Sequence, residues 1–136
     1  RAGLITANNR WCGVDWRTSE SLAAKRVHVL GDATLSGPLM PKSGSMANQH
    51  AKVCAAAVVA LLDGQEPEAD PRIVNTCYSY VSDEEATWIG SVHELDASRK
   101  TFVPIKGAGG VSAARNTLEA KYAWSWAQNI WADMLG

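Results

Sequence analysis

Several common functional motifs are missing from this sequence of 136 residues. Its three cysteines, Cys12, Cys54 and Cys77, lie far apart and form no CxxC pair and no Cys/His ligand spacing. This argues against a structural zinc site and a dense disulfide framework, and the odd count leaves at least one thiol free or paired outside the chain. No Gly-rich phosphate loop occurs, and no apolar run approaches the ~20 residues of a transmembrane helix.

The sequence also has no marked excess of positive or negative residues. The formal net charge is -1, so neither nucleic acid nor an anionic membrane is an expected partner. The apolar fraction of 46% and the charged fraction of 20% are those of a globular protein of one domain, or of the tail of a larger one. The sequence starts at Arg1 without a signal peptide, so we expect a processed or truncated chain. No metal site is expected, because the histidines are isolated: His28, His50 and His93.

The first half of the sequence has the order strand, loop, helix. Val27 to Leu30 is short, mostly apolar, and bounded by Gly31, which predicts a buried strand. The following segment, residues 34–44, is rich in glycine and proline and predicts irregular structure.

Ser45 to Leu62 predicts a helix, capped by Ser43 or Ser45 and ended by Gly64. A buried face is expected where apolar residues recur at helical spacing. These residues are Ala47, Ala51, Cys54, Ala55, Val58, Val59 and Leu62. The small side chains from Ala51 to Ala57 suit close packing on a sheet.

An acidic linker with two prolines, "DGQEPEADPR", follows this helix, and we place a domain boundary there, between residues 1–65 and 66–136. Three runs beyond it predict strands, and "KGAGG" is expected to end the last of them. The runs are Val74–Val81, Thr87–Leu95 and Thr101–Ile105. Val111 to Leu135 predicts mainly helix, with Leu118, Tyr122, Trp126 and Ile130 at fourfold spacing. The predicted fold is therefore α/β plus α+β: strand, loop and helix, then a small β-β-β-α domain.

Two polar features in the first half are candidates for binding. Asp32 follows the expected strand at its carboxyl end, where open α/β folds bind ligands, but a turn-forming aspartate would look the same. In "MPKSGSMANQ", a helix N-terminus and Lys42 could favour negative charge on a bound ring. An ordinary capped helix with a solvated lysine is the alternative.

The second half offers one thiol and one aromatic candidate. Cys77 stands in "NTCYSYV", and a lone cysteine in a strand is most often an inert buried residue unless it has a redox partner. Trp126 belongs to a tryptophan-rich last helix, which is more often core or subunit interface than a cofactor stack. It is kept as a candidate neighbour of a cofactor.

Several sequence stretches, distributed over most of the chain, resemble one protein family. "VHVLGDA", "MPKSG-x-x-AN", "AKVCAAAVVALL", "NTCYS" and "YAWSWAQNIWADMLG" resemble the C-terminal part of the flavoprotein subunit of flavocytochrome c sulfide dehydrogenase, a relative of the pyridine nucleotide-disulfide oxidoreductases. The Gly-Asp element is shared by many flavoproteins, whereas "PKSG…AKVCAAAVVALL" followed by "NTCYS" is more specific. The resemblance makes 1–65 the C-terminal part of an FAD-binding domain and 66–136 the flavin-binding, interface domain.

The resemblance implies roles for individual residues. Gly31 and Asp32 would contact FAD, with the carboxylate on the ribityl chain. The pyrimidine edge of the flavin would lie near Pro41, Lys42 and Ser43. Cys77 would be half of a redox-active disulfide above the flavin, and Trp126 would lie near the ring. Ser45 and Met46 stand where the family has an aromatic residue after "PKSG".

The implied activity is FAD-dependent oxidation of sulfide to sulfur or polysulfide, with electrons passed to a c-type cytochrome subunit in the periplasm. In the family, the phosphate-binding loop and the second cysteine lie far upstream, so we expect this chain to be an incomplete enzyme and the rest of the subunit to be a partner. Two alternatives remain open. One is a flavoprotein similar to sulfide:quinone oxidoreductase, disfavoured because the last helix lacks a basic face. The other is a non-enzymatic cytochrome-docking module.

Overall fold

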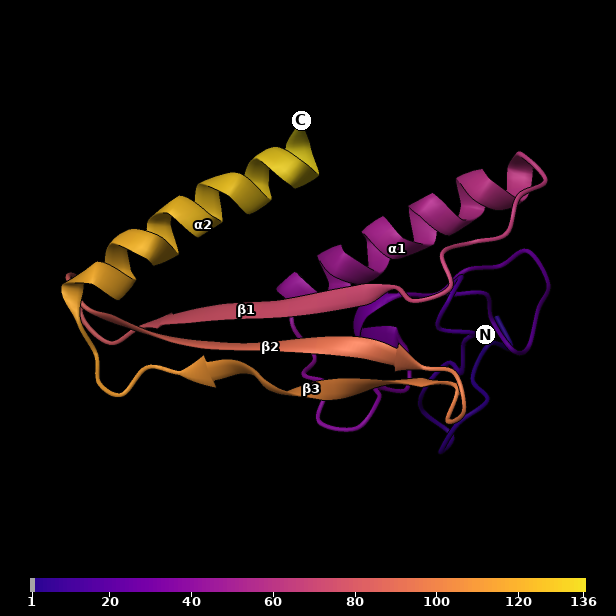
Figure 1. Cartoon of the computed structure of the whole chain (residues 1–136), viewed down its shortest axis with the longest axis horizontal. Helices are drawn as coiled ribbons and strands as arrows, with labels where there is room; N and C mark the ends of the chain where they lie inside the picture. Colours follow the sequence, from indigo (N-terminus) through magenta and orange to yellow (C-terminus); the bar gives the residue numbers. More distant parts are fainter. Residues whose placement is uncertain (1) are drawn as a thin grey trace.

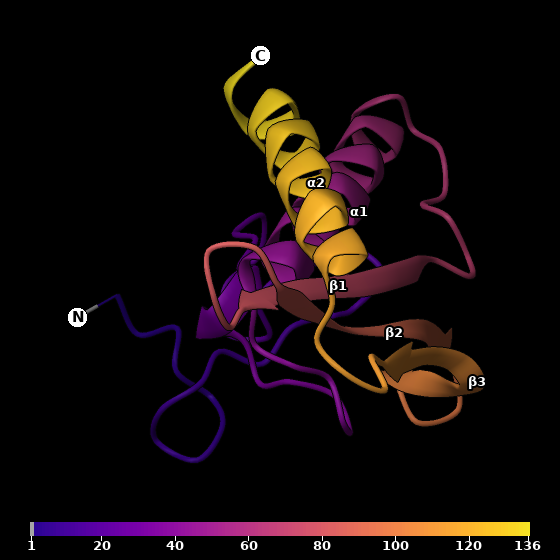
Figure 2. The same cartoon turned by 90° about the vertical axis from the view of Figure 1, so that its left-hand side faces the viewer.

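A computed structural model describes residues 2–136. A short 3-10 helix, η1 (Gly31–Ala33), precedes the helix α1 (Gly44–Leu62). Three strands follow, namely β1 (Arg72–Tyr80), β2 (Ala86–Asp96) and β3 (Thr101–Val111), and the chain ends in α2 (Thr117–Leu135). The strands form one antiparallel sheet in the order β1-β2-β3. Figures 1 and 2 show both helices beside β1, an edge strand, on the same side of the sheet. The β-β-β-α arrangement of the second half is confirmed.

Helix α1 is confirmed to within one residue, and Ser43 is its N-cap because its Oγ accepts the Met46 N–H. Cys54 is buried as expected, but the predicted apolar face is wrong in its outer half, since Val59 is 58% and Leu62 is 81% exposed. Only the first part of α1 packs on β1 and η1, while its far end points away from the sheet (Figure 1). The buried residues are Ser45, Met46, His50, Cys54 and Ala57.

The three predicted strands are present, but the last one is longer than predicted. β3 continues through "KGAGG", the segment that was expected to end it. Pairing at this point requires glycine, because the Cβ of any other residue at position 109 would lie only 2.4 Å from the Gly90 carbonyl oxygen. The two strands approach closely here, next to a register shift between Ser91 and His93 of β2.

The predicted strand at Val27–Leu30 is wrong. This segment is extended but makes only an isolated bridge between Glu20 and His28. Its backbone bonds go to the loop at Ser19 and Ser21, and no parallel strand lies beside it among residues 2–136. Without a neighbouring strand to pair with, this short and mostly apolar segment does not become a sheet strand.

The main core joins both halves of the chain. Val14, Trp16, Met40 and Met46 of the first half pack with two sheet residues, Ile73 and Phe102. The rings of Trp16 and Phe102 meet edge to face at 5.6 Å. The contact fixes the sheet to α1 and the N-terminal loops, and the division at residue 65 stays a prediction.

Helix α2 begins later than predicted, because β3 reaches Val111 and Asn116 caps the helix by accepting the Glu119 N–H. Its closest packing uses small side chains, with Ala120 and Ala123 against Ala86. Trp126 and Ile130 of the predicted stripe are half-buried, whereas the other two members are more than half exposed: Leu118 and Tyr122. Packing through alanines brings the first half of α2 close to the sheet and leaves its second half splayed from it (Figure 1).

Candidate functional site

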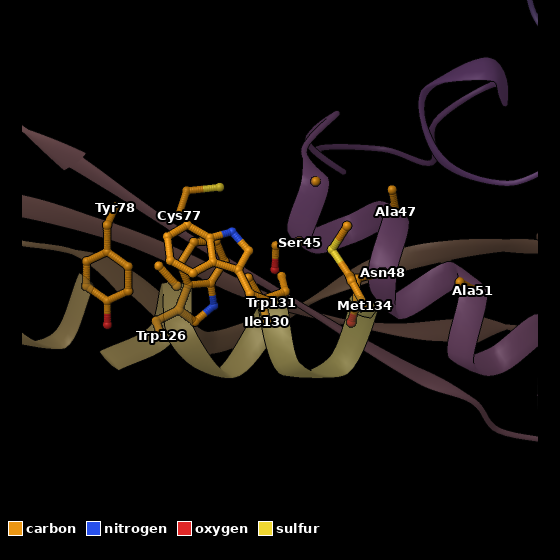
Figure 3. A pocket seen from close by; sticks show the side chains of 12 residues that line it. Ser45, Ala47, Asn48, Ala51, Cys77, Tyr78, Trp126, Ile130, Trp131 and Met134 are labelled. Atoms are coloured by element: carbon orange, nitrogen blue, oxygen red, sulfur yellow. The ribbon is translucent and has the colours of Figure 1, made fainter. Parts of the chain in front are cut away.

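A pocket of about 650 Å³ opens beside β1, between the start of α1 and the second half of α2. Its walls are mainly apolar, and Figure 3 shows the side chains from β1 and from both helices that line it. The principal lining residues are Ser45, Ala47, Cys77, Tyr78, Trp126 and Trp131. Two of the residues selected from the sequence, Cys77 and Trp126, therefore meet at one place.

Cys77 reaches the pocket from β1, where it is half-buried and pairs with Ile89. Its thiol donates to the side-chain oxygen of Asn75 at 3.4 Å. The same oxygen accepts the Ser43 hydroxyl at 2.7 Å, and Asn75 is only 3% exposed. A buried amide thus connects the thiol with the residue that caps α1. The thiol is free, and the other two cysteines, Cys12 and Cys54, are buried outside the pocket.

Ser45 has a structural function at the position where the family carries an aromatic residue. Its buried Oγ accepts the Thr76 N–H at 3.0 Å. Because β1 is an edge strand in the sheet that residues 2–136 form, no described strand lies on the outer side of this N–H, and Ser45 supplies the acceptor. The small side chain also lines the pocket and leaves its space open.

The N-terminus of α1 faces the pocket through Gly44 and Ser45. The first N–H groups of a helix lack partners within the helix, and the helix dipole adds partial positive charge at this end. Ser43 satisfies only the Met46 N–H. This wall of the pocket consequently favours an electron-rich or anionic group.

Trp126 and Tyr78 form an aromatic wall. Their ring centroids are 5.9 Å apart at an angle of 52°. Burial raises the pKa of the Tyr78 phenol, and the negative charges of Glu119 and of an ionised Tyr122 act in the same direction. Tyr78 is therefore a neutral aromatic surface at physiological pH.

Gly31 and Asp32 lie outside the pocket lining, in the η1 turn. Gly31 has φ of +65°, which favours glycine, and a Cβ there would lie 3.1 Å from the Ala47 Cβ. The Gly31 N–H donates to His50 Nδ1 at 3.2 Å. The backbone of this turn is held, while the side chain of Asp32 is exposed.

Pro41, Lys42 and Ser43 form the loop that leads from η1 into α1 and also lie outside the lining. Lys42 Nζ donates to two carbonyl oxygens, that of Asp32 at 2.9 Å and that of Thr34 at 2.7 Å. It also lies 4.0 Å from the centroid of the Trp11 ring. Lys42 is thus bound to the turn that carries Asp32 instead of being freely solvated.

Sequence reasoning missed several residues of this site. Asn75 was not considered, and Ser45 was noted only as an alternative helix cap and as the replacement for the family's aromatic residue. Both act through hydrogen bonds to distant segments, which no local pattern predicts. Tyr78 and Trp131 were visible only as aromatic residues in a strand and a helix. Their meeting depends on how α2 crosses β1, which periodicity does not define.

The pocket fits the ring system of a flavin by size and chemistry. Its volume lies within the ~300–1,000 Å³ of small-molecule sites. Aromatic walls suit a flat conjugated ring, and the helix N-terminus suits the side of that ring which becomes electron-rich on reduction. Among residues 2–136, no helix combines the length and apolar character needed to span a bilayer.

One comparison with known proteins bears on this geometry. Residues 69–135 match the family model described as "Flavocytochrome c sulphide dehydrogenase, flavin-binding". The matched segment contains β1 to β3 and all of α2, and thus two of the pocket's three walls, including Cys77 and Trp126. The match confirms the family resemblance and agrees with FAD as the cofactor. Residues 69–135, the second half of the chain, therefore belong to the flavocytochrome c sulphide dehydrogenase family as its flavin-binding domain.

Proposed function

We propose that the chain is the flavin-ring-contacting part of an FAD-dependent sulfide dehydrogenase. It would oxidise sulfide to sulfur or polysulfide through a redox-active disulfide that includes Cys77. The observation that supports this most is the convergence of Cys77, the α1 N-terminus and Trp126 on one pocket, within a chain whose second half matches a flavin-binding family.

Cys77 would act as one sulfur of a disulfide whose second cysteine belongs to the rest of the flavoprotein subunit. Hydrosulfide attacks one sulfur, a new S–S bond forms as a persulfide, and the old S–S bond breaks to release a thiolate. When held by this pocket, FAD would supply a two-electron acceptor for the reduced sulfurs and a one-electron donor for the next electron carrier. The half-buried position of Cys77 in the pocket wall suits an exchange that needs access for a small anion.

The start of α1 would stabilise negative charge on the flavin ring. Gly44 and Ser45 present the positive end of the helix dipole to the pocket. Lys42, Pro41 and Ser43 would line the approach to the pyrimidine edge. Lys42 would contribute charge from the place where the Asp32 and Thr34 carbonyls hold it.

Asp32 would bind the ribityl chain of FAD by accepting hydrogen bonds from its hydroxyl groups. Its exposed carboxylate on a fixed turn is suited to that task, because little order is lost on binding. The phosphate half of the cofactor would be bound by a Gly-rich loop upstream in the subunit. We also propose a periplasmic location and a c-type cytochrome as the electron acceptor.

The electron acceptor distinguishes this proposal from the alternative of an enzyme similar to sulfide:quinone oxidoreductase. Helix α2 has only one basic residue, Lys121, and so offers no basic face to a membrane surface. We expect the flavoprotein that contains this chain to reduce cytochrome c in the presence of sulfide, and a soluble quinone analogue much more slowly.

The contact between Asp32 and the cofactor can be tested by Asp32→Ala in the flavoprotein that contains this chain. We expect FAD to bind roughly 10- to 100-fold more weakly, because a charged acceptor of hydrogen bonds is lost. Flavin fluorescence on titration of the apoprotein measures this affinity. Asp63→Ala, which removes an exposed aspartate at the far end of α1, is the control and should leave the affinity unchanged. Equal affinities for the parent and Asp32→Ala would refute the contact.

A further inference from the structure

One buried polar side chain has no place in the proposed chemistry. His50 lies on the inner face of α1 and is only 4% exposed. Its ring meets Trp16 edge to face at 5.1 Å, and its Nδ1 accepts the Gly31 N–H. A buried imidazole in a helix costs desolvation, so its position calls for a physical reason.

The charge state of His50 follows from its surroundings. Burial lowers its pKa to about 4; the positive charge of Lys42 adds to this lowering, and the negative charge of Asp32 opposes it. The ring is therefore neutral at physiological pH, and because Nδ1 accepts, the proton is on Nε2. Nε2 has no hydrogen-bond partner among residues 2–136. The contact with Gly31 is thus the polar interaction that this side chain makes.

That single bond acts on the segment that carries Asp32. Gly31 needs its left-handed backbone to pass close over Ala47, one helical turn before His50. The next carbonyl, that of Asp32, accepts Lys42 Nζ, and the Gly31 carbonyl accepts the Thr34 hydroxyl at 2.7 Å. The turn is consequently bound on both sides of Asp32, and His50 accepts the hydrogen bond that joins it to α1.

We propose that His50 is a positioning residue for cofactor binding, which holds the Gly31–Ala33 turn on α1 so that the Asp32 carboxylate has a fixed direction. The proposal rests on the proposed function for its link to FAD. Its structural part, the control of the turn by the imidazole, stands without it.

Two variants distinguish the hydrogen-bond acceptor of His50 from the contribution of its side chain to packing. His50→Asn places a side-chain oxygen at the branch where Nδ1 lies, whereas His50→Leu fills similar space without an acceptor. We expect the Gly31 amide to exchange its proton roughly 10-fold faster in His50→Leu than in the parent, with much of the protection restored in His50→Asn. NMR hydrogen exchange on the full chain measures this.

A pH series keeps the test informative if His50→Leu does not fold. In an Asp32→Asn background, where the imidazole is the group that changes charge beside Gly31, the Gly31 amide shift should follow the titration of His50. Its pKa should then lie below the parent's value of about 4, because the Asp32 charge no longer raises it. In His50→Asn this shift change should vanish. A Gly31 amide that is insensitive to His50 in both experiments would overturn the proposal.

The link to the cofactor is measured separately in the flavoprotein that contains this chain. We expect His50→Leu to weaken FAD binding roughly 10-fold and His50→Asn to restore it. If Asp32→Ala leaves FAD affinity unchanged while the Gly31 amide still responds to His50, the proposed Asp32 contact fails and the structural part of the inference survives. If Asp32→Ala weakens binding but His50→Leu does not, the positioning role is wrong.

Discussion

Cys77→Ser should abolish the reduction of flavin by sulfide in the flavoprotein that contains this chain. We expect the rate at which sulfide bleaches the flavin absorbance to fall at least about 1,000-fold, because the oxygen cannot form the disulfide that the reaction consumes. The fold should persist, since a serine hydroxyl can donate to Asn75 in place of the thiol. Stopped-flow absorbance at the flavin band after mixing with sulfide measures the rate.

Cys54→Ala is the matched control for this experiment. It also removes a buried free thiol, but one on α1 outside the pocket, so bleaching should continue at close to the parent rate. FAD content must be equal in the three proteins, so that a lost rate is not a lost cofactor. Bleaching of Cys77→Ser at the parent rate would eliminate the proposed disulfide.

Acid should destabilise the chain in the range between the ordinary pKa of histidine and the lowered pKa of His50. The unfolded chain takes up a proton near pH 6.5, whereas folded His50 does so only at about 4. The unfolded state therefore binds more protons between these values, and the stabilisation present above pH 6.5 is lost as the pH falls toward 4. The shift corresponds to about 3 kcal/mol of unfolding free energy. Burial lowers the pKa of His93 as well, which adds loss in the same direction.

Urea unfolding at several pH values between 7 and 4 measures this dependence. His50→Asn should remove the part of the slope that His50 contributes and leave the part that belongs to His93. Its stability at pH 7 will also be lower, because the smaller side chain leaves space against Trp16, so slopes and not absolute values are compared. A parent protein with the same unfolding free energy at pH 7 and pH 4 would contradict the expected titration, and so would an unchanged slope in His50→Asn.

Local sequence signals predicted the elements that depend on local interactions. Helix α1 was predictable from Ser43 and Gly64, which mark its ends, and the three strands from their alternation between turn residues. The same reasoning failed at Val27–Leu30, where an apolar run has no neighbouring strand, and at "KGAGG", where glycines extend a strand because the two chains touch. Both failures depend on tertiary context that local preference does not contain: a neighbouring strand is missing in the first case, and two strands touch in the second.

The residues of the candidate site were also predictable only in part. Cys77 and Trp126 were selected by residue type and by family resemblance, and they lie in one pocket. Asn75 and His50 were not, and Ser45 was noted only as the replacement for the family's aromatic residue. The hydrogen bonds of all three join segments 19 to 32 residues apart, so these bonds were not predictable. Polar residues close to an apolar helix face, such as Ser45 and His50, were the available local signal. They depart from the binary pattern of a buried helix, and such departures often mark functional positions.

A crystal structure of the FAD-loaded flavoprotein that contains this chain tests the central proposal most directly. We predict that the flavin ring lies in the pocket between the start of α1 and Trp126, with the sulfur of Cys77 in contact with the ring and the Asp32 carboxylate on the ribityl chain. A ring bound elsewhere, with this pocket filled by other protein segments, would contradict the proposed site.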